Sequence, residues 1–177
     1  DVYKRQMQQS MEPMAVTAFD LIQVHNLVDW KTQLSTLQNW KGKNKVRYIG
    51  ITTSHRQKHN EVEAVMRNEA IDFVQFSYNI ENRQAEERLL PLAQERGIAT
   101  LINRPYQMGK LFKKSKNKAL PDLAQELNCE SWGQFYLKFI LAHPAVTCLI
   151  PATAKPSHMR DNICLLYTSP SPRDVEE

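Results

Sequence analysis

Polar side chains recur in this sequence at the points where short apolar runs end. They are His25, Asn26, Thr52, Thr53, Gln75, Asn103, Arg104 and Thr153. In barrels of parallel strands the active site is built where the strands end, from the loops that follow them. Each residue alone suits a turn or a cap. Their repetition at successive strand ends instead favours a shared functional site.

The stretch Asp20–Asn26 (DLIQVHN) is the sharpest of these strand ends. Side chains alternate faces along a strand, so Gln23 and His25 share one face with Leu21. A histidine that follows a buried strand is typical of α/β enzymes that direct chemistry out of a sheet. A buried histidine hydrogen-bonded to a backbone carbonyl is the alternative, and the stretch alone does not separate the two.

Three other features suggest chemistry less strongly. His55, His59 and Glu63 lie at helical spacing, but they lack a fourth ligand and the His-Glu-x-x-His pattern, which favours a solvated helix start and no metal site. The basic run at 110–118 is interpreted as a solvated loop, with phosphate attraction as the alternative. Aromatic residues within 131–139 (SWGQFYLKF) follow helical spacing and are expected in the core, not as a nucleic-acid stacking platform. They are Trp132, Phe135, Tyr136 and Phe139.

The elements that must position these residues alternate between strand and helix. Strands are predicted at 20–25, 46–52, 73–76, 98–102 and 146–150. Helices are predicted at 7–14, 31–42, 57–68, 81–96 with an interruption at Pro91, 121–128 and 131–142, with a final one starting near Pro156. A long polar loop is expected at 103–118. This alternation predicts parallel βαβ units in an open sheet or a barrel, and no Gly-x-Gly-x-x-Gly turn supports a Rossmann site.

Composition sets broad limits. The 177 residues are 42% hydrophobic and 24% charged, which is typical of one soluble globular domain. No apolar run approaches the roughly 20 residues needed to cross a bilayer, and no signal peptide is visible. A net charge of +4 is too small to indicate nucleic-acid binding. The three scattered cysteines favour a reducing, cytoplasmic location.

The two ends suggest sequence of non-biological origin. Residues 1–6 (DVYKRQ) can be encoded by GAT GTG TAT AAG AGA CAG, and the reverse complement of that DNA encodes CLLYTS, the sequence of residues 164–169. The pair therefore resembles one sequencing adapter in inverted orientation. We expect residues 1–6 and 164–177 to be non-native tails around a partial domain at 7–163.

Six segments together resemble the aldo-keto reductase family, whose members are (β/α)8 TIM-type barrels that reduce carbonyls with NADPH. The segments are DLIQVHN, VRYIGITTS, DFVQFSYN, RLLPLAQERGIA, INRPYQMGKLF and IPATAKPSHMRDN. The resemblance covers residues 7–163. It implies an α/β fold, an incomplete barrel of about the last five βα units, and a fragment of an enzyme that reduces aldehydes or ketones to alcohols.

The resemblance also implies roles for individual residues. His25 matches the catalytic histidine that orients the substrate carbonyl, and Gln75 matches the glutamine that binds the nicotinamide carboxamide. Thr52 and Thr53 stand where the family usually has Ser and Asn for the same purpose. Asn103 replaces the aromatic residue that stacks under the nicotinamide.

The remaining matches concern the phosphates and the adenosine of the cofactor. Arg104, Pro105 and Tyr106 match the loop near the pyrophosphate. The residues that match the segment around the adenosine and its 2′-phosphate are Thr153, Lys155, His158 and Asn162. Loop amides, a helix N-terminus and a lysine suit an anion. Ala152 replaces a frequent lysine, so NADPH is expected and NADH stays open.

The family's proton-donating tyrosine and its lysine and aspartate partners belong upstream of the matched region, and Tyr78, Tyr106 and Tyr136 do not match them. We therefore expect negligible reductase activity from this polypeptide. Two alternatives are a barrel that binds nicotinamide nucleotide without turnover and a metal-independent barrel lyase or isomerase that uses His25. Small carbonyl substrates are expected as partners, without nucleic acid or membrane, and the oligomeric state is left open.

Overall fold

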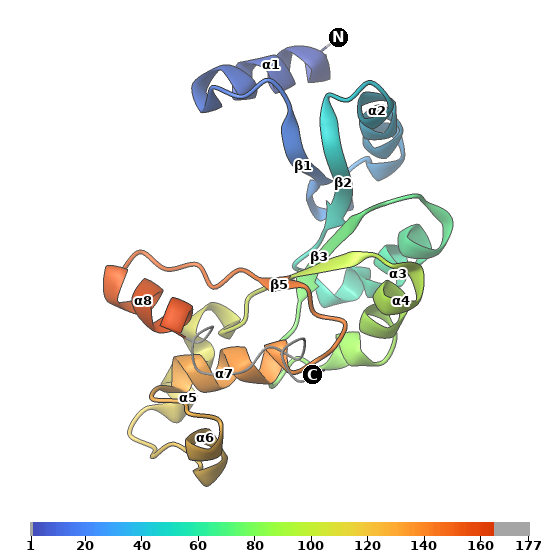
Figure 1. Cartoon of the computed structure of the whole chain (residues 1–177). Helices are drawn as coiled ribbons and strands as arrows, with labels where there is room; N and C mark the ends of the chain where they lie inside the picture. The colour runs from blue at the N-terminus through green and yellow to red at the C-terminus, as the bar shows by residue number, and fades with distance from the viewer. Residues whose placement is uncertain (1, 165–177) are drawn as a thin grey trace, which may run out of the picture.

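The computed structural model describes residues 2–164, so the tail prediction for 165–177 lies outside the described residues. A parallel sheet organises this part of the chain (Figure 1). Its strands are β1 (Phe19–Val24), β2 (Val46–Thr52), β3 (Phe73–Ser77), β4 (Ala99–Asn103) and β5 (Cys148–Leu149). They pair in the order β1-β2-β3-β4-β5, so each strand is hydrogen-bonded to the next one along the chain.

Helical segments connect the strands, as the alternating pattern predicted. They are α1 (Val2–Met14), α2 (Trp30–Gly42), α3 (His59–Asn68), α4 (Leu89–Arg96), α5 (Lys110–Ser115), α6 (Asp122–Glu126), α7 (Trp132–Leu141) and α8 (Pro156–Cys164). Helix α1 runs across the predicted junction between residues 6 and 7 and ends one residue after Pro13. Within residues 2–164, no helix combines the length and the apolar character that a membrane span requires.

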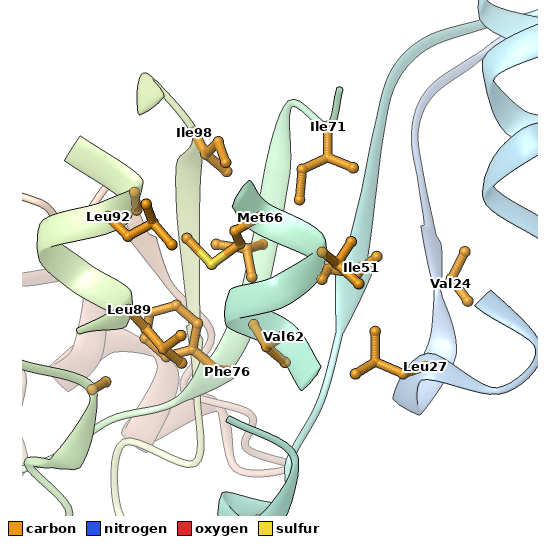
Figure 2. Close-up of a cluster of buried hydrophobic side chains, with 14 of the residues drawn as sticks. Val24, Leu27, Ile51, Val62, Met66, Ile71, Phe76, Leu89, Leu92 and Ile98 are labelled. Atoms are coloured by element: carbon orange, nitrogen blue, oxygen red, sulfur yellow. The ribbon is translucent and has the colours of Figure 1, made fainter. Parts of the chain in front are cut away.

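The core lies between the sheet and helices α2, α3 and α4 (Figure 2). The apolar stripe of α3, made of Val62, Val65 and Met66, is fully buried. On the sheet, Ile51 and Phe76 belong to the face that packs against these helices. Alternation along each strand therefore leaves the opposite face for the side chains between them.

A close approach of two strands depends on Gly50. A Cβ atom at this position would lie 2.3 Å from the backbone oxygen of Phe73, well inside van der Waals contact. Gly50 is paired with Phe73 in the β2–β3 ladder. The absence of a side chain at Gly50 thus sets how closely β2 and β3 can lie.

Three predicted elements differ from the structure. Strand β5 is shorter than 146–150 because the Thr100 and Thr147 hydroxyl oxygens each accept a hydrogen bond from the other residue's backbone nitrogen at 3.0 Å. Pro91 does not interrupt a helix over 81–96: the helix begins at Leu89, where a proline in the first turn removes no intrahelical hydrogen bond. The predicted loop at 103–118 contains helix α5.

Candidate functional site

Polar side chains occupy the sheet face opposite the buried core. Thr52 is paired with Gln75 in the β2–β3 ladder, and Ser77 is paired with Asn103 in the β3–β4 ladder. Gln75 and Asn103 are half-buried, whereas their strand neighbours on the other face, such as Phe76, are completely buried. The carboxyl ends of three neighbouring strands therefore present hydroxyl and amide groups on one face.

Asn103 connects these strand ends. Its side-chain oxygen accepts a hydrogen bond from the Ser77 hydroxyl at 2.5 Å, and its side-chain nitrogen donates to the backbone oxygen of Thr53 at 3.1 Å. Thr53 is 1% exposed, and its hydroxyl oxygen accepts from the backbone nitrogen of His55 at 3.1 Å. Asn103 therefore holds the ends of β2, β3 and β4 together, and Thr53 is committed to the turn that follows β2.

His25 follows β1 in a short 3-10 turn, η1 (His25–Leu27), and its side chain is exposed. The last residue of β1, Val24, is paired with Ile51, so the turn lies beside the end of β2. Asn26 has a left-handed φ of 52°, and its backbone oxygen accepts a hydrogen bond from Lys58 at 2.9 Å. The alternative of a buried histidine is therefore wrong, and His25 is available to a ligand.

The loop after β4 is held in an unusual backbone conformation. Arg104, Gln107, Met108 and Gly109 all have φ values in the left-handed region, between 48° and 82°. The side chain of Asn79, which is 1% exposed, donates to the backbone oxygen of Arg104 at 3.1 Å. This buried amide keeps the loop in a conformation that non-glycine residues rarely adopt.

This loop forms one wall of a cavity of about 760 Å³. Six of the predicted cofactor-binding residues line it: Arg104, Pro105, Tyr106, Thr153, His158 and Asn162. They come from the loop after β4, the segment after β5 and helix α8. The structure thus brings together two sequence segments that lie about 50 residues apart, as the separation of 56 residues between Tyr106 and Asn162 illustrates.

One hydrogen bond joins these two segments directly. The Tyr106 hydroxyl donates to the side-chain oxygen of Asn162 at 2.6 Å. Burial, and then the negative charge of Asp161, raise the pKa of Tyr106 above its ordinary value. The phenol therefore stays protonated at neutral pH and keeps its role as donor.

Thr153 lies in the segment that connects β5 to α8. Its hydroxyl oxygen accepts from the backbone nitrogen of Lys155 at 3.2 Å and lies 3.5 Å from the ring nitrogen Nδ1 of His158. Lys155 itself is exposed and does not line the cavity. Lys155 directly precedes α8, and the backbone amides at a helix N-terminus also favour an anion.

Apart from Lys155, the predicted site residues form two groups. One group lines the cavity, and the other lies along the ends of β1 to β4 outside the cavity lining. The second group comprises His25, Thr52, Thr53, Gln75 and Asn103. Arg104 lies between them, because it follows Asn103 directly and its guanidinium donates to the backbone oxygen of Ser54 at 3.3 Å.

Several cavity residues were missed in the sequence. They are Met108, Gly109, Phe112, Ser131, Trp132, Gly133, Ile150 and Asp161. Trp132 was expected in the core, but it is half-buried and lines the cavity, in ring contact with Tyr136 at 5.4 Å. Helical spacing identifies a residue on an apolar stripe, yet it does not distinguish the core from a cavity wall.

The histidines with Glu63 and the basic run at 110–118 both differ from what the sequence predicted. His59 is not solvated but 5% exposed, in edge contact with the Phe76 ring at 6.4 Å. Within the described residues, no group of three or more His, Cys, Asp or Glu side chains is placed to hold a metal ion. The basic run is mainly helix α5, in which Lys114 pairs with Glu81 at 2.7 Å.

Comparison with known proteins gives the chain a family. The model of the Aldo/keto reductase family matches residues 2–176, and the chain belongs to this family. An uncharacterized oxidoreductase of Schizosaccharomyces pombe is 26% identical over 163 residues, which are 90% of this chain and 51% of the yeast protein. The chain thus spans about half the length of that relative.

Solved structures agree on the fold. The thermostable aldo-keto reductase Tm1743, solved with the inhibitor epalrestat, matches 98% of this chain with a TM-score of 0.74 at 24% identity, over 64% of its own length. An aldo/keto reductase from Klebsiella pneumoniae, solved with NADP and acetate, matches 98% of this chain with a TM-score of 0.75 at 18% identity, over 62% of its length. The described sheet and its helices are therefore part of an aldo-keto reductase barrel, which confirms the predicted fold.

Proposed function

We propose that this chain forms the nucleotide-binding part of an NADPH-dependent reductase of aldehydes or ketones. The observation that supports this proposal most strongly is the cavity of about 760 Å³, which gathers six of the residues matched to the family's cofactor segment. Family membership supports oxidoreductase chemistry. The Klebsiella pneumoniae structure with NADP shows that a protein of this fold binds such a nucleotide.

The cavity fits the adenosine end of a dinucleotide. Its volume lies within the usual range for small-molecule sites, about 300–1,000 Å³. The Tyr106 and Phe112 rings, 4.7 Å apart, and the Trp132 ring offer apolar faces to a purine. Thr153 and His158 supply polar groups at the start of α8, where Lys155 adds a positive charge for a 2′-phosphate.

The carbonyl end of the reaction belongs to the second group of residues. When bound, the nicotinamide supplies a hydride to the substrate carbonyl. We assign to His25 the orientation of the carbonyl oxygen, because its ring is exposed beside the end of β2. Gln75 and Thr52, neighbours on the opposite face from the core, are assigned to the nicotinamide carboxamide.

We further propose that this polypeptide binds the nucleotide but does not reduce carbonyls. A developing alkoxide needs a proton donor, and the family uses a tyrosine for it. The hydroxyls of Tyr78, Tyr106 and Tyr136 donate to Glu86, Asn162 and the backbone oxygen of Leu111, respectively. These three hydroxyls are therefore occupied elsewhere.

Binding of the adenosine end is the first test. Titration with 2′,5′-ADP should quench tryptophan fluorescence through Trp132, and Trp132→Phe should remove most of the signal while Trp40→Phe should not. We expect 2′,5′-ADP to bind about tenfold more tightly than 5′-AMP because the 2′-phosphate gains a charge-assisted contact. Equal and millimolar affinities for both nucleotides would contradict the assignment to NADPH.

Turnover separates the proposal from its alternatives. The 177-residue chain should bind NADPH without oxidising it in the presence of an aldehyde. A longer polypeptide that adds the family's Tyr, Lys and Asp should turn over, and His25→Ala in that polypeptide should abolish turnover. Activity that does not depend on a nicotinamide nucleotide would favour the lyase or isomerase alternative.

A further inference from the structure

Helix α8 carries three residues of the cavity wall, His158, Asp161 and Asn162, yet it contributes no fully buried side chain to the protein. Met159 and Ile163 on this helix are 44% and 46% exposed. Apolar burial, which holds most helices in place, is therefore weak here. Polar contacts must supply most of what fixes α8 against the rest of the chain.

The strongest of these contacts are made by Asp161. One carboxylate oxygen accepts from the Ser131 hydroxyl at 2.7 Å, and the other accepts from the Gln134 side-chain nitrogen at 2.7 Å. Both partners lie at the start of α7, about 30 residues earlier in the sequence. Hydrogen bonds to a charged acceptor are about twice as strong as those between neutral groups.

The partners of Asp161 are themselves held in place. Ser131 caps α7, because its hydroxyl oxygen accepts from the backbone nitrogen of Gln134 at 3.1 Å. The side-chain oxygen of Gln134, which is 4% exposed, accepts from the backbone nitrogen of Glu130 at 2.8 Å. Each polar group therefore has a defined orientation, and the amide of Gln134 can present only its nitrogen to Asp161.

The backbone of α7 leaves room for this contact at Gly133. A Cβ atom at this position would lie 3.0 Å from a carboxylate oxygen of Asp161 and 3.6 Å from the Tyr106 hydroxyl. The carboxylate thus lies next to the hydrogen bond from Tyr106 to Asn162. The contact between α7 and α8 and the wall of the cavity form one continuous structure.

We propose that Asp161 is a positioning residue: its contacts with Ser131 and Gln134 hold α8 against α7 and thereby set the distance between Asn162 and Tyr106 across the nucleotide cavity. This inference rests on the proposed function for the identity of the ligand. Asp161 is part of the cavity wall, but each of its carboxylate oxygens already accepts a hydrogen bond from α7 or its cap, so we infer that it acts through the placement of α8. Release of this contact should free α8 and weaken the binding of the adenosine end.

An added negative charge tests the contact while keeping the fold of α7. Gln134→Glu preserves the acceptor for Glu130 but places a carboxylate against Asp161. We expect hydrogen exchange of the α8 amides to become about tenfold faster, and the Kd for 2′,5′-ADP to rise about tenfold, because like charges replace a donor–acceptor pair. Exchange in α3 should not change.

The double variant Gln134→Glu/Asp161→Asn restores a donor opposite an acceptor. It should return both the exchange of α8 and the Kd to within about threefold of the original chain, because coupled contacts are not additive. Asp122→Asn, which removes an exposed carboxylate on α6, is the matched control. Unchanged α8 exchange in Gln134→Glu, or no recovery in the double variant, would overturn the role of Asp161.

The affinity for 2′,5′-ADP tests the proposed function, whereas hydrogen exchange of the α8 amides tests the positioning role of Asp161. If the unsubstituted chain does not bind 2′,5′-ADP, the proposed function is wrong. The exchange of α8 in the ligand-free protein still decides whether Asp161 holds this helix. A loss of affinity with unchanged exchange would also overturn the positioning role, because Asp161 would then act on the ligand directly.

Discussion

The side-chain nitrogen of Asn103 lies 3.1 Å from the backbone oxygen of Thr53, which ties the end of β4 to the end of β2 across the intervening strand. The other end of the same amide accepts from Ser77 on that strand. In the family resemblance, this position belongs to an aromatic residue. Here an amide occupies it and has a structural role between strands.

Replacement of this amide should therefore reduce stability. Asn103→Ala leaves the Thr53 carbonyl and the Ser77 hydroxyl without this partner, and we expect a loss of about 1–3 kcal/mol in the free energy of unfolding. Urea denaturation measures it. Asn39→Ala, on the exposed side of α2, is the control and should change stability by less than about 0.5 kcal/mol. Equal effects of the two substitutions would argue against the bridging role.

Gly50→Ala should be more damaging. The new Cβ would lie 2.3 Å from the backbone oxygen of Phe73, and the contact is with a strand that cannot move aside cheaply. We expect a loss of about 3 kcal/mol or more. Gly42→Ala is the matched control, because no atom lies within 4 Å of its Cβ position, and it should be neutral or slightly stabilising. Thermal unfolding of both variants would show the difference.

Glu86 should make the free energy of unfolding depend on pH in the acidic range. Hydrogen bonds from Arg83, and to a smaller extent from Tyr78 at 2.6 Å, lower the pKa of Glu86 in the folded protein, although burial opposes them. The carboxylate therefore stabilises the fold above the ordinary glutamate pKa of about 4.3, and this contribution is lost as the pH falls through the lowered value.

The measurement is urea denaturation between pH 6 and pH 3. Glu86→Gln should lower stability at pH 6 and flatten its decline below about pH 4.3. Glu126→Gln, an exposed position on helix α6, controls for the general loss of one carboxylate. If Glu86→Gln and the original chain decline in parallel, the network of Glu86, Arg83 and Tyr78 does not contribute as proposed.

Tyr106→Phe tests the hydrogen bond across the cavity without changing its apolar wall. Loss of the donor to Asn162 should raise the Kd for 2′,5′-ADP about fivefold, in line with one hydrogen bond of roughly 1 kcal/mol. Isothermal titration provides the measurement. Tyr48→Phe, on β2 and outside the cavity lining, should leave the affinity unchanged. An unchanged Kd in Tyr106→Phe would indicate that the nucleotide does not bind in this cavity.

The order and type of the elements were readable from the sequence because their signals are local. Strand β2 begins and ends as predicted, and His25 lies at the end of β1. Thr147 was not readable as a strand breaker, because its hydroxyl bonds depend on Thr100, 47 residues away. The structure does not test the chemical roles assigned to the site residues, so these stay predictions.

The cavity was only half predictable for a related reason. The loop from Arg104 and the segment before Asn162 each matched a motif, and the structure brings them together. The helical spacing of Trp132 predicted a core residue, because residues in the core and residues in a cavity wall have the same periodicity. The role of Asp161 could not be predicted from its sequence neighbours, because its hydrogen-bond partners come from α7, which packs against α8.

The consecutive strand order has a consequence for how the protein is made. Each strand of the described sheet pairs with the strand that leaves the ribosome directly before it, from β1 to β5. No strand has to wait for a distant partner, and the sheet can grow in the direction of synthesis. Helix α8, the last of the described elements to emerge, then docks onto a cavity wall that is already in place.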